Sequence, residues 1–191
     1  MKATDASYLA GFMDGDGSIH FQLVRQDGYR FGFYIRVSLS LSQCTSDREG
    51  LEQLQRLIGA GYLRDRGTGM SDLVITSRPV LMRILSEVEP FVVFKRQVRK
   101  ALEIMSRIKR RPDPQEFLEL ARAVDAFSAL NHSKTKRVFA ADVERHLQGM
   151  GLLVPVTTSS MTLFGEMETP ILNGSIYELH NTPAPRKRVK V

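Results

Sequence analysis

Two aspartates near the start of the chain have the type and spacing of residues that handle divalent cations. Asp14 and Asp16 stand in the stretch 9–17, LAGFMDGDG, where an apolar, helix-like segment ends in Asp-Gly-Asp-Gly. Carboxylate oxygens are the ligands that magnesium and calcium prefer, but a calcium loop of the EF-hand type would need further acidic ligands and a closing glutamate. His20 and Phe21 follow instead. These residues alone leave two alternatives, a plain turn and a cation site.

The composition favours an anionic partner. The 191-residue chain has a formal net charge of +6, a pI of about 9.7 and 42% hydrophobic residues. A basic balance suggests a nucleic acid or an anionic surface without choosing between them. The single cysteine, Cys44, excludes an internal disulfide and a cysteine-built metal site. No apolar run is long enough to span a bilayer, so we expect an intracellular protein with no membrane partner.

The hydrophobic pattern changes period directly after the aspartates. We expect a first helix, capped by Asp5 or Ser7, that ends near Met13 because Gly15 and Gly17 stop it. From residue 18 apolar side chains alternate with polar ones, and the alternation resumes over 30–41 after a turn near 27–28. This period of two predicts an antiparallel hairpin that is buried on one face, with hydrogen-bonding and positively charged groups on the open face.

The rest of the chain completes an α+β layering. We expect a helix at 47–57, a second hairpin over 61–76, and helices near 79–88, 94–108, 115–130 and 140–150. The order is a helix-hairpin-helix-hairpin-helix core with one antiparallel sheet, followed by C-terminal helices. Residues 1–152 would form this domain. Residues 153–191 are predicted to be an appendage of uncertain structure that ends in RKRVKV. We interpret RKRVKV as a solvated tail. The alternatives are a nonspecific DNA arm and a nuclear-import-like cluster.

The stretch 9–17 closely resembles the signature of the LAGLIDADG homing endonucleases. Leu9, Ala10, Gly11, Asp14, Asp16 and Gly17 occupy signature positions. The segments GYLRDRG, EPFVVFKRQ, FLELARAVD and ALNHSKTK resemble the single-motif, homodimeric branch of the same family, so the similarity covers about residues 6–150. The resemblance implies a sheet that forms a DNA saddle and motif helices of two subunits that pack together. The predicted dimer interface is Leu9, Ala10, Gly11 and Met13.

The resemblance also implies a catalytic centre. Asp16 of each chain and the Gly15 carbonyl would hold Mg²⁺, with Mn²⁺ or Ca²⁺ substituting for binding. Gln43 corresponds to a residue that positions the attacking water, and Lys95 to a lysine near the scissile phosphate. The chain departs from the family where a basic residue is expected, because Asp47 stands there. Either Arg48 substitutes from the next position, or Asp47 caps a helix and the basic role is weakened.

Recognition of double-stranded DNA would use the polar faces of both hairpins, because a two-stranded ribbon fits the major groove. An arginine side chain can donate two hydrogen bonds to guanine, and a glutamine side chain can form two with adenine. Asp72 would either accept a hydrogen bond from cytosine or brace a nearby arginine. The predicted base-contacting residues are His20, Gln22, Gln26, Tyr29, Tyr34, Arg36, Ser38, Ser40, Arg64, Arg66 and Asp72. The predicted backbone contacts, which position the duplex without reading its sequence, are Ser133, Lys134, Lys136 and Arg137.

The sequence therefore predicts a homodimeric, site-specific DNA endonuclease of the intron-homing type. It would hydrolyse both strands of a long pseudo-palindromic site with Mg²⁺. The alternative is a DNA- or RNA-binding module of the same fold, a maturase or a regulator, that does not cleave. The family implies an organelle, either chloroplast or mitochondrion, or a prokaryotic cytoplasm. Neither the target sequence nor the host follows from the residues.

Overall fold

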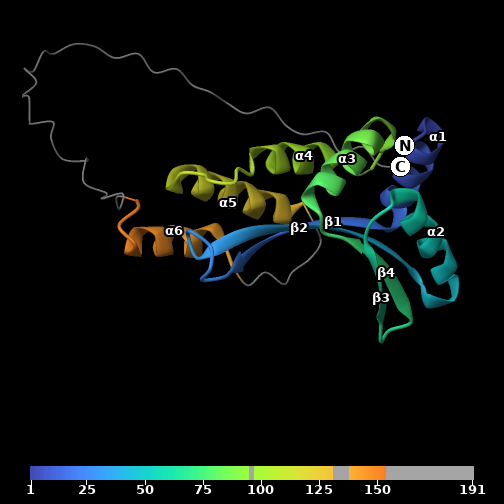
Figure 1. Ribbon diagram of the computed structural model, residues 1–191, viewed down its shortest axis with the longest axis horizontal. Helices are drawn as coiled ribbons and strands as arrows, with labels where there is room; N and C mark the ends of the chain where they lie inside the picture. The colour runs from blue at the N-terminus through green and yellow to red at the C-terminus, as the bar shows by residue number, and fades with distance from the viewer. Residues whose placement is uncertain (95–96, 131–137, 154–191) are drawn as a thin grey trace, which may run out of the picture. The chain divides into compact units, whose positions relative to one another are not determined.

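A computed structural model describes residues 1–94, 97–130 and 138–153, and the account of the structure is confined to these (Figure 1). Lys95, Ser133, Lys134, Lys136 and Arg137 lie outside the described residues, and so does the tail from residue 154. None of the described helices is long and apolar enough to cross a membrane.

A four-stranded antiparallel sheet forms one layer of the fold. Its strands are β1 (Gly17–Arg25), β2 (Phe33–Cys44), β3 (Tyr62–Arg66) and β4 (Met70–Ile75), in the order β1-β2-β4-β3. The period-two alternation of the sequence is confirmed along β1, where Ile19, Phe21 and Leu23 are buried. The two hairpins therefore lie side by side through the pairing of β2 with β4.

Helices pack over one face of this sheet. In Figure 1, α3, α4 and α5 lie on the same side of β1 and β2, while the β3–β4 hairpin extends on the opposite side. The predicted α+β class is confirmed. The helices are α1 (Ala3–Asp16), α2 (Arg48–Ile58), α3 (Arg78–Val88), α4 (Gln97–Arg107), α5 (Pro114–Ala129) and α6 (Ala140–Gly149), with short 3₁₀ turns η1 (Thr45–Asp47) and η2 (Glu89–Phe91).

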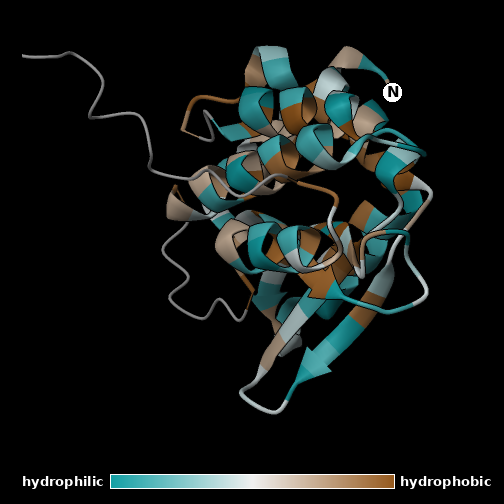
Figure 2. Ribbon diagram, turned by 90° about the vertical axis from the view of Figure 1, so that its left-hand side faces the viewer, coloured by the Kyte–Doolittle hydropathy of each residue, from teal (hydrophilic) through white to brown (hydrophobic). Residues whose placement is uncertain are grey.

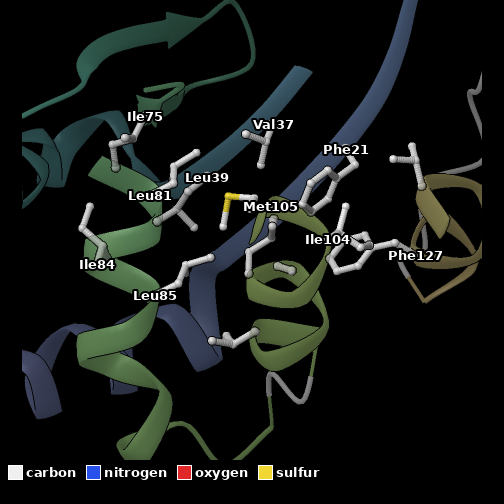
Figure 3. Close-up of a cluster of buried hydrophobic side chains, with 14 of the residues drawn as sticks. Phe21, Val37, Leu39, Ile75, Leu81, Ile84, Leu85, Ile104, Met105 and Phe127 are labelled. Atoms are coloured by element: carbon white, nitrogen blue, oxygen red, sulfur yellow. The ribbon is translucent and has the colours of Figure 1, made fainter. Parts of the chain in front are cut away.

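One hydrophobic core lies between the sheet and the helices. Phe21 of β1 meets Phe127 of α5 edge-on, with ring centroids 4.8 Å apart. Leu81 and Leu85 of α3 and Met105 of α4 point into the same cluster (Figure 3). In Figure 2 the brown segments of these helices alternate with teal ones, as expected when one face of each helix is buried. This core fixes the sheet so that its other face is open.

Helix α1 is longer than the sequence predicts at both ends. It begins at Ala3 without a side-chain cap, continues through Gly15 and ends at Asp16, so the expected stop at Met13 is wrong. Gly17 begins β1 with no intervening loop, and a Cβ atom there would lie 2.6 Å from the Met13 carbonyl oxygen. Gly17 is therefore needed for the close approach of strand and helix, whereas Gly15 does not break the helix.

Candidate active site

The carboxylate of Asp16 lies at the exposed end of α1, where the helix meets the sheet. Gly17, the next residue, pairs with Leu41 of β2. Within the described part of the chain, Asp16 makes no hydrogen bond or ion pair. The last carbonyls of a helix lack intrahelical donors, and the Gly15 carbonyl is one of them. An exposed carboxylate next to an available carbonyl is a donor set that suits a hard divalent cation.

One chain supplies only part of such a cation site. Over residues 1–94, 97–130 and 138–153, no group of three or more His, Cys, Asp or Glu side chains could hold an ion. A cation at Asp16 would need further oxygen ligands from water, from phosphate or from a second copy of the chain. The residues present therefore fit the predicted half-site.

Asp14, the first aspartate of the motif, has a different environment from Asp16. Its Oδ2 atom accepts a hydrogen bond from the backbone N–H of Val93 at 2.7 Å, and its Oδ1 atom accepts one from Phe94 at 3.1 Å. Both carboxylate oxygens are thus engaged by a segment that lies about eighty residues further along the chain. No pattern of side chains in the sequence predicts this role of Asp14, because its partners are backbone N–H groups.

Gln43 lies at the same end of the sheet as Asp16. It is two residues beyond Leu41, whose strand partner is Gly17, and it shares the face of Leu41. Its side-chain oxygen accepts a hydrogen bond from the backbone N–H of Cys44 at 3.0 Å. The register therefore brings Gln43 and Asp16 to one region, while a role in positioning water stays a prediction.

Arg48 is held by two carboxylates. Its Nη1 atom lies 3.2 Å from Asp65 on β3, and its Nε atom lies 3.7 Å from Glu52 one turn along α2. The same Asp65 accepts a hydrogen bond from buried Ser71 at 2.8 Å, and Ser71 also bonds the Thr45 hydroxyl. Arg48 thus connects the start of α2 to the end of the sheet. Asp47 stands at the N-cap position of α2, as the alternative predicts, but its side chain makes no capping hydrogen bond.

Polar side chains line the sheet face that no helix covers, which we call the open face. Strand pairing sets Gln22 opposite Arg36 and His20 opposite Ser38. Arg36 donates from Nε to the Gln22 side-chain oxygen at 3.1 Å, so the two predicted base-reading residues hold each other. His20 is partly buried, and this burial lowers the pKa of its imidazole. The open face is therefore uncharged at His20 near neutral pH and positive at Arg36.

The rings of Tyr29 and Tyr34 extend the open face toward the β1–β2 loop. They stack with centroids 4.7 Å apart, and Tyr29 is 48% exposed. Gln26 is exposed at the start of this loop, where its backbone N–H bonds the Gly32 carbonyl. A stacked aromatic pair with Tyr29 exposed, beside a glutamine, is a surface on which a base or sugar could pack.

Asp72 braces arginines and does not face outward. Its side chain is fully buried, and it accepts hydrogen bonds from Arg64 Nη2 and Arg66 Nε, both at 2.7 Å, and from the Ser42 hydroxyl at 2.7 Å. Burial alone would raise the pKa of Asp72, but the hydrogen bonds from Arg66, Arg64 and Ser42 outweigh it and lower the pKa to about 2. The bracing alternative is thus the correct one, and direct acceptance from cytosine is excluded while both arginines stay in place.

Three of the four predicted dimer-interface residues are buried inside the chain itself. Leu9, Ala10 and Met13 are 0–1% exposed and belong to the core, so they cannot face a second subunit. Gly11 is exposed, and its place in a dimer interface stays a prediction. The exposed face of α1 instead carries Thr4, Tyr8, Gly11 and Gly15, spaced by four, three and four residues.

Comparison with known proteins identifies the family. Residues 9–91 match the model of the LAGLIDADG endonuclease domain. The chain is 35% identical over 145 residues to DNA endonuclease I-CreI of Chlamydomonas reinhardtii, which covers 75% of this chain and 88% of that protein. It is 31% identical over 149 residues to DNA endonuclease I-CvuI of Chlorella vulgaris, which covers 78% of this chain and 92% of that protein.

A solved structure agrees with the sequence match. The structure of I-CvuI in complex with its target in the presence of 2 mM Ca superposes with a TM-score of 0.74 and 30% identity, covering 80% of this chain and 98% of that one. A second I-CvuI structure, with the I-CreI target in 2 mM Mg and uncleaved DNA, also has a TM-score of 0.74 and 30% identity, over 80% and 100% of the two chains.

The chain belongs to the LAGLIDADG family of homing endonucleases. Within that family it is a single-motif, I-CreI-like member, and its activity is that of a site-specific DNA endonuclease.

Proposed function

We propose that two copies of this chain form a symmetric dimer that binds a long, roughly palindromic duplex and hydrolyses one phosphodiester bond in each strand with Mg²⁺. The observation that carries the proposal is the exposed end of α1, where Asp16 is free of partners within the described part of the chain, next to two outward-facing glycines. The biological setting would be intron homing, as in the family.

The surface of α1 supports a dimer. A Cβ atom built at Gly11 or at Gly15 meets no atom within 4 Å, so no described residue requires a glycine at either position. Glycines that face outward let a second helix approach closely, backbone to backbone. Tyr8, on the same face, is 62% exposed. Because each chain has one motif helix, a two-fold axis through this face would bring the two Asp16 carboxylates together.

The cation requirement follows from that arrangement. Two carboxylates brought close together repel each other unless a cation lies between them. Asp16 and the Gly15 carbonyl of each chain would hold Mg²⁺, with Ca²⁺ or Mn²⁺ able to support binding. A divalent cation, when bound, supplies charge neutralisation at the phosphate and activation of water. The chain's own part is to place one carboxylate per subunit at the end of a rigid helix and, through Gln43, to orient a water.

The open face would read the DNA. Its arginines are fixed before binding, since Asp72 holds Arg64 and Arg66 and Gln22 holds Arg36. A preorganised guanidinium loses less freedom when it forks onto guanine than a mobile one does. Two chains carry a formal charge of +12, twice the +6 of one chain, and affinity should therefore fall steeply as salt is raised.

Cleavage of a defined duplex tests the proposal. The first substrate is the I-CreI target that was crystallised with I-CvuI, and the second is a library of random duplexes selected for cutting. We expect cuts in both strands with Mg²⁺, a dimeric complex by sedimentation, and no cutting by Asp16→Asn, which should still bind DNA in Ca²⁺. Tight, sequence-specific binding by the wild-type chain without a cut in any library member would instead identify a binding module.

A further inference from the structure

The carboxylate of Asp14 joins two segments that meet at the candidate active site. It lies in the last turn of α1, two residues before Asp16, and it accepts hydrogen bonds from the consecutive backbone N–H groups of Val93 and Phe94. These two residues follow η2 and precede Lys95 in the chain. The end of the motif helix and the segment that leads to the candidate lysine are thus connected by a single side chain.

Burial of side chains does not hold that segment in place. Val93 is 67% exposed and Phe94 is 78% exposed, whereas Val92 packs partly against the core. Beyond Val92, therefore, the described backbone is held by its hydrogen bonds to Asp14. A carboxylate that accepts two N–H donors makes charge-assisted hydrogen bonds, which are shorter and stronger than neutral ones.

The position of Asp14 in the helix is locally unfavourable. The C-terminal end of a helix carries partial negative charge and favours cations, but the last turn of α1 contains Asp14 and Asp16 and no basic residue. The N–H groups of Val93 and Phe94 compensate this cost at Asp14. At Asp16 no described residue does so. Asp14 therefore makes a contact within the chain, whereas Asp16 faces outward.

We propose that Asp14 is a positioning residue for DNA cleavage: its carboxylate fixes the backbone at residues 93–94 against the end of α1. Lys95 follows Phe94 directly in the sequence, so Asp14 holds the backbone of the residue that precedes the candidate lysine. This inference rests on the proposed function for its effect on rate. It gives Asp14 a role within the chain, distinct from that of a metal ligand, because each of its oxygens accepts a backbone N–H.

The test compares Asp14→Ala and Asp14→Asn with a matched control. The control is Asp113→Asn, since Asp113 also accepts a backbone N–H, that of Glu116 at 2.8 Å, but caps α5 away from the site. Four quantities are measured: amide hydrogen exchange at residues 93 and 94, the single-turnover cleavage rate, the affinity for DNA in Ca²⁺, and the Mg²⁺ concentration that gives half-maximal rate. Thermal unfolding checks that each variant is folded.

We expect faster exchange at both amides in Asp14→Ala and a cleavage rate lower by about ten- to a hundredfold, the scale of a small misplacement at a reacting centre. Asp14→Asn should lie between Asp14→Ala and wild type, because its amide oxygen still accepts one N–H. DNA affinity and the half-maximal Mg²⁺ concentration should stay within about threefold of wild type, since neither a base contact nor a metal ligand is removed. Asp113→Asn should cut at the wild-type rate.

The outcomes separate this inference from the proposed function. A wild-type chain that cuts no duplex refutes the proposed function. Unchanged amide exchange at residues 93 and 94 in Asp14→Ala refutes the inference that Asp14 fixes this backbone, whether or not the enzyme cuts. Faster exchange with a wild-type cleavage rate would refute the effect on catalysis. A rate that is restored by raising Mg²⁺, with exchange unchanged, would make Asp14 a metal ligand and overturn the inference.

Discussion

Replacing Asp72 by Asn tests how the sheet holds its arginines. The substitution keeps the size of a fully buried side chain but removes the charge that Arg64 and Arg66 share. The amide of the new side chain would also direct N–H groups at the guanidinium groups or at the Ser42 hydroxyl. We therefore expect lower stability and less firmly held arginines, with no change in the core.

The magnitude follows from the pKa of Asp72. The pKa falls from 3.8 to about 2 on folding, and one pKa unit is worth about 1.36 kcal/mol. The carboxylate thus contributes about 2 kcal/mol at neutral pH, as an upper estimate, because Arg64 and Arg66 are 56% and 44% exposed and water screens them. Since the folded pKa is the lower one, this contribution is complete above the unfolded value and is lost as the pH falls through about 2.

Urea unfolding of wild type and Asp72→Asn at several pH values measures this contribution. The difference in unfolding free energy should be about 2 kcal/mol at pH 7 and about half of that near pH 3. Asp27→Asn is the control, because Asp27 lies in the exposed β1–β2 loop and makes no contact with another described side chain. A difference that is already negligible at pH 7, or that stays constant down to pH 3, would refute the reasoning.

Three further predictions follow from the contacts of single residues. Gly17→Ala should destabilise the chain by about 1–3 kcal/mol in urea unfolding, because its Cβ would lie 2.6 Å from the Met13 carbonyl oxygen, whereas Gly15→Ala should not. Arg66→Ala should relax base preference at one position of a cleavage-selected library by about 1–3 kcal/mol. Arg48→Ala should lower the single-turnover rate, because Asp65 and Glu52 place its guanidinium as the basic group predicted for the periphery of the site; an unchanged rate would exclude that role.

The sheet was predictable because its sequence signal is local. Alternation of apolar and polar residues over 18–24 identified β1, and the alternation over 30–41 identified β2, which begins only at Phe33. The residues of β1 and β2 on the open face then follow from a period of two, whereas Gln26 and Tyr29 lie in the loop between them. The pairing of Arg64 and Arg66 with Asp72 was only one of two alternatives, because the sequence does not show that β4 lies between β2 and β3.

For helix α1, the dimer interface predicted from the motif was wrong at three residues. The resemblance assigned Leu9, Ala10 and Met13 to a dimer interface without fixing the rotation of the helix about its axis. Ala6, Leu9, Ala10 and Met13 are spaced by three, one and three residues, which is the pattern of a buried helical stripe. Reading that spacing would have assigned them to the core. The expected stop at Met13 failed because propensity disfavours glycine in a helix by only about 1 kcal/mol, which tertiary contacts override.

The motif contains residues whose types are explained by the folding of one chain and residues whose types are not. Leu9, Ala10 and Met13 fill the core, and Gly17 permits the turn into β1. Each of these would be needed if the chain acted alone. A Cβ atom at Gly11 or Gly15 would meet no described atom within 4 Å, and Asp16 makes no hydrogen bond or ion pair with a described residue. A sequence that needed only to fold would gain about 0.5–1 kcal/mol from alanine at each of these helical glycines. The proposed dimer accounts for these two glycines, because the backbone of a second α1 helix would approach the first one there.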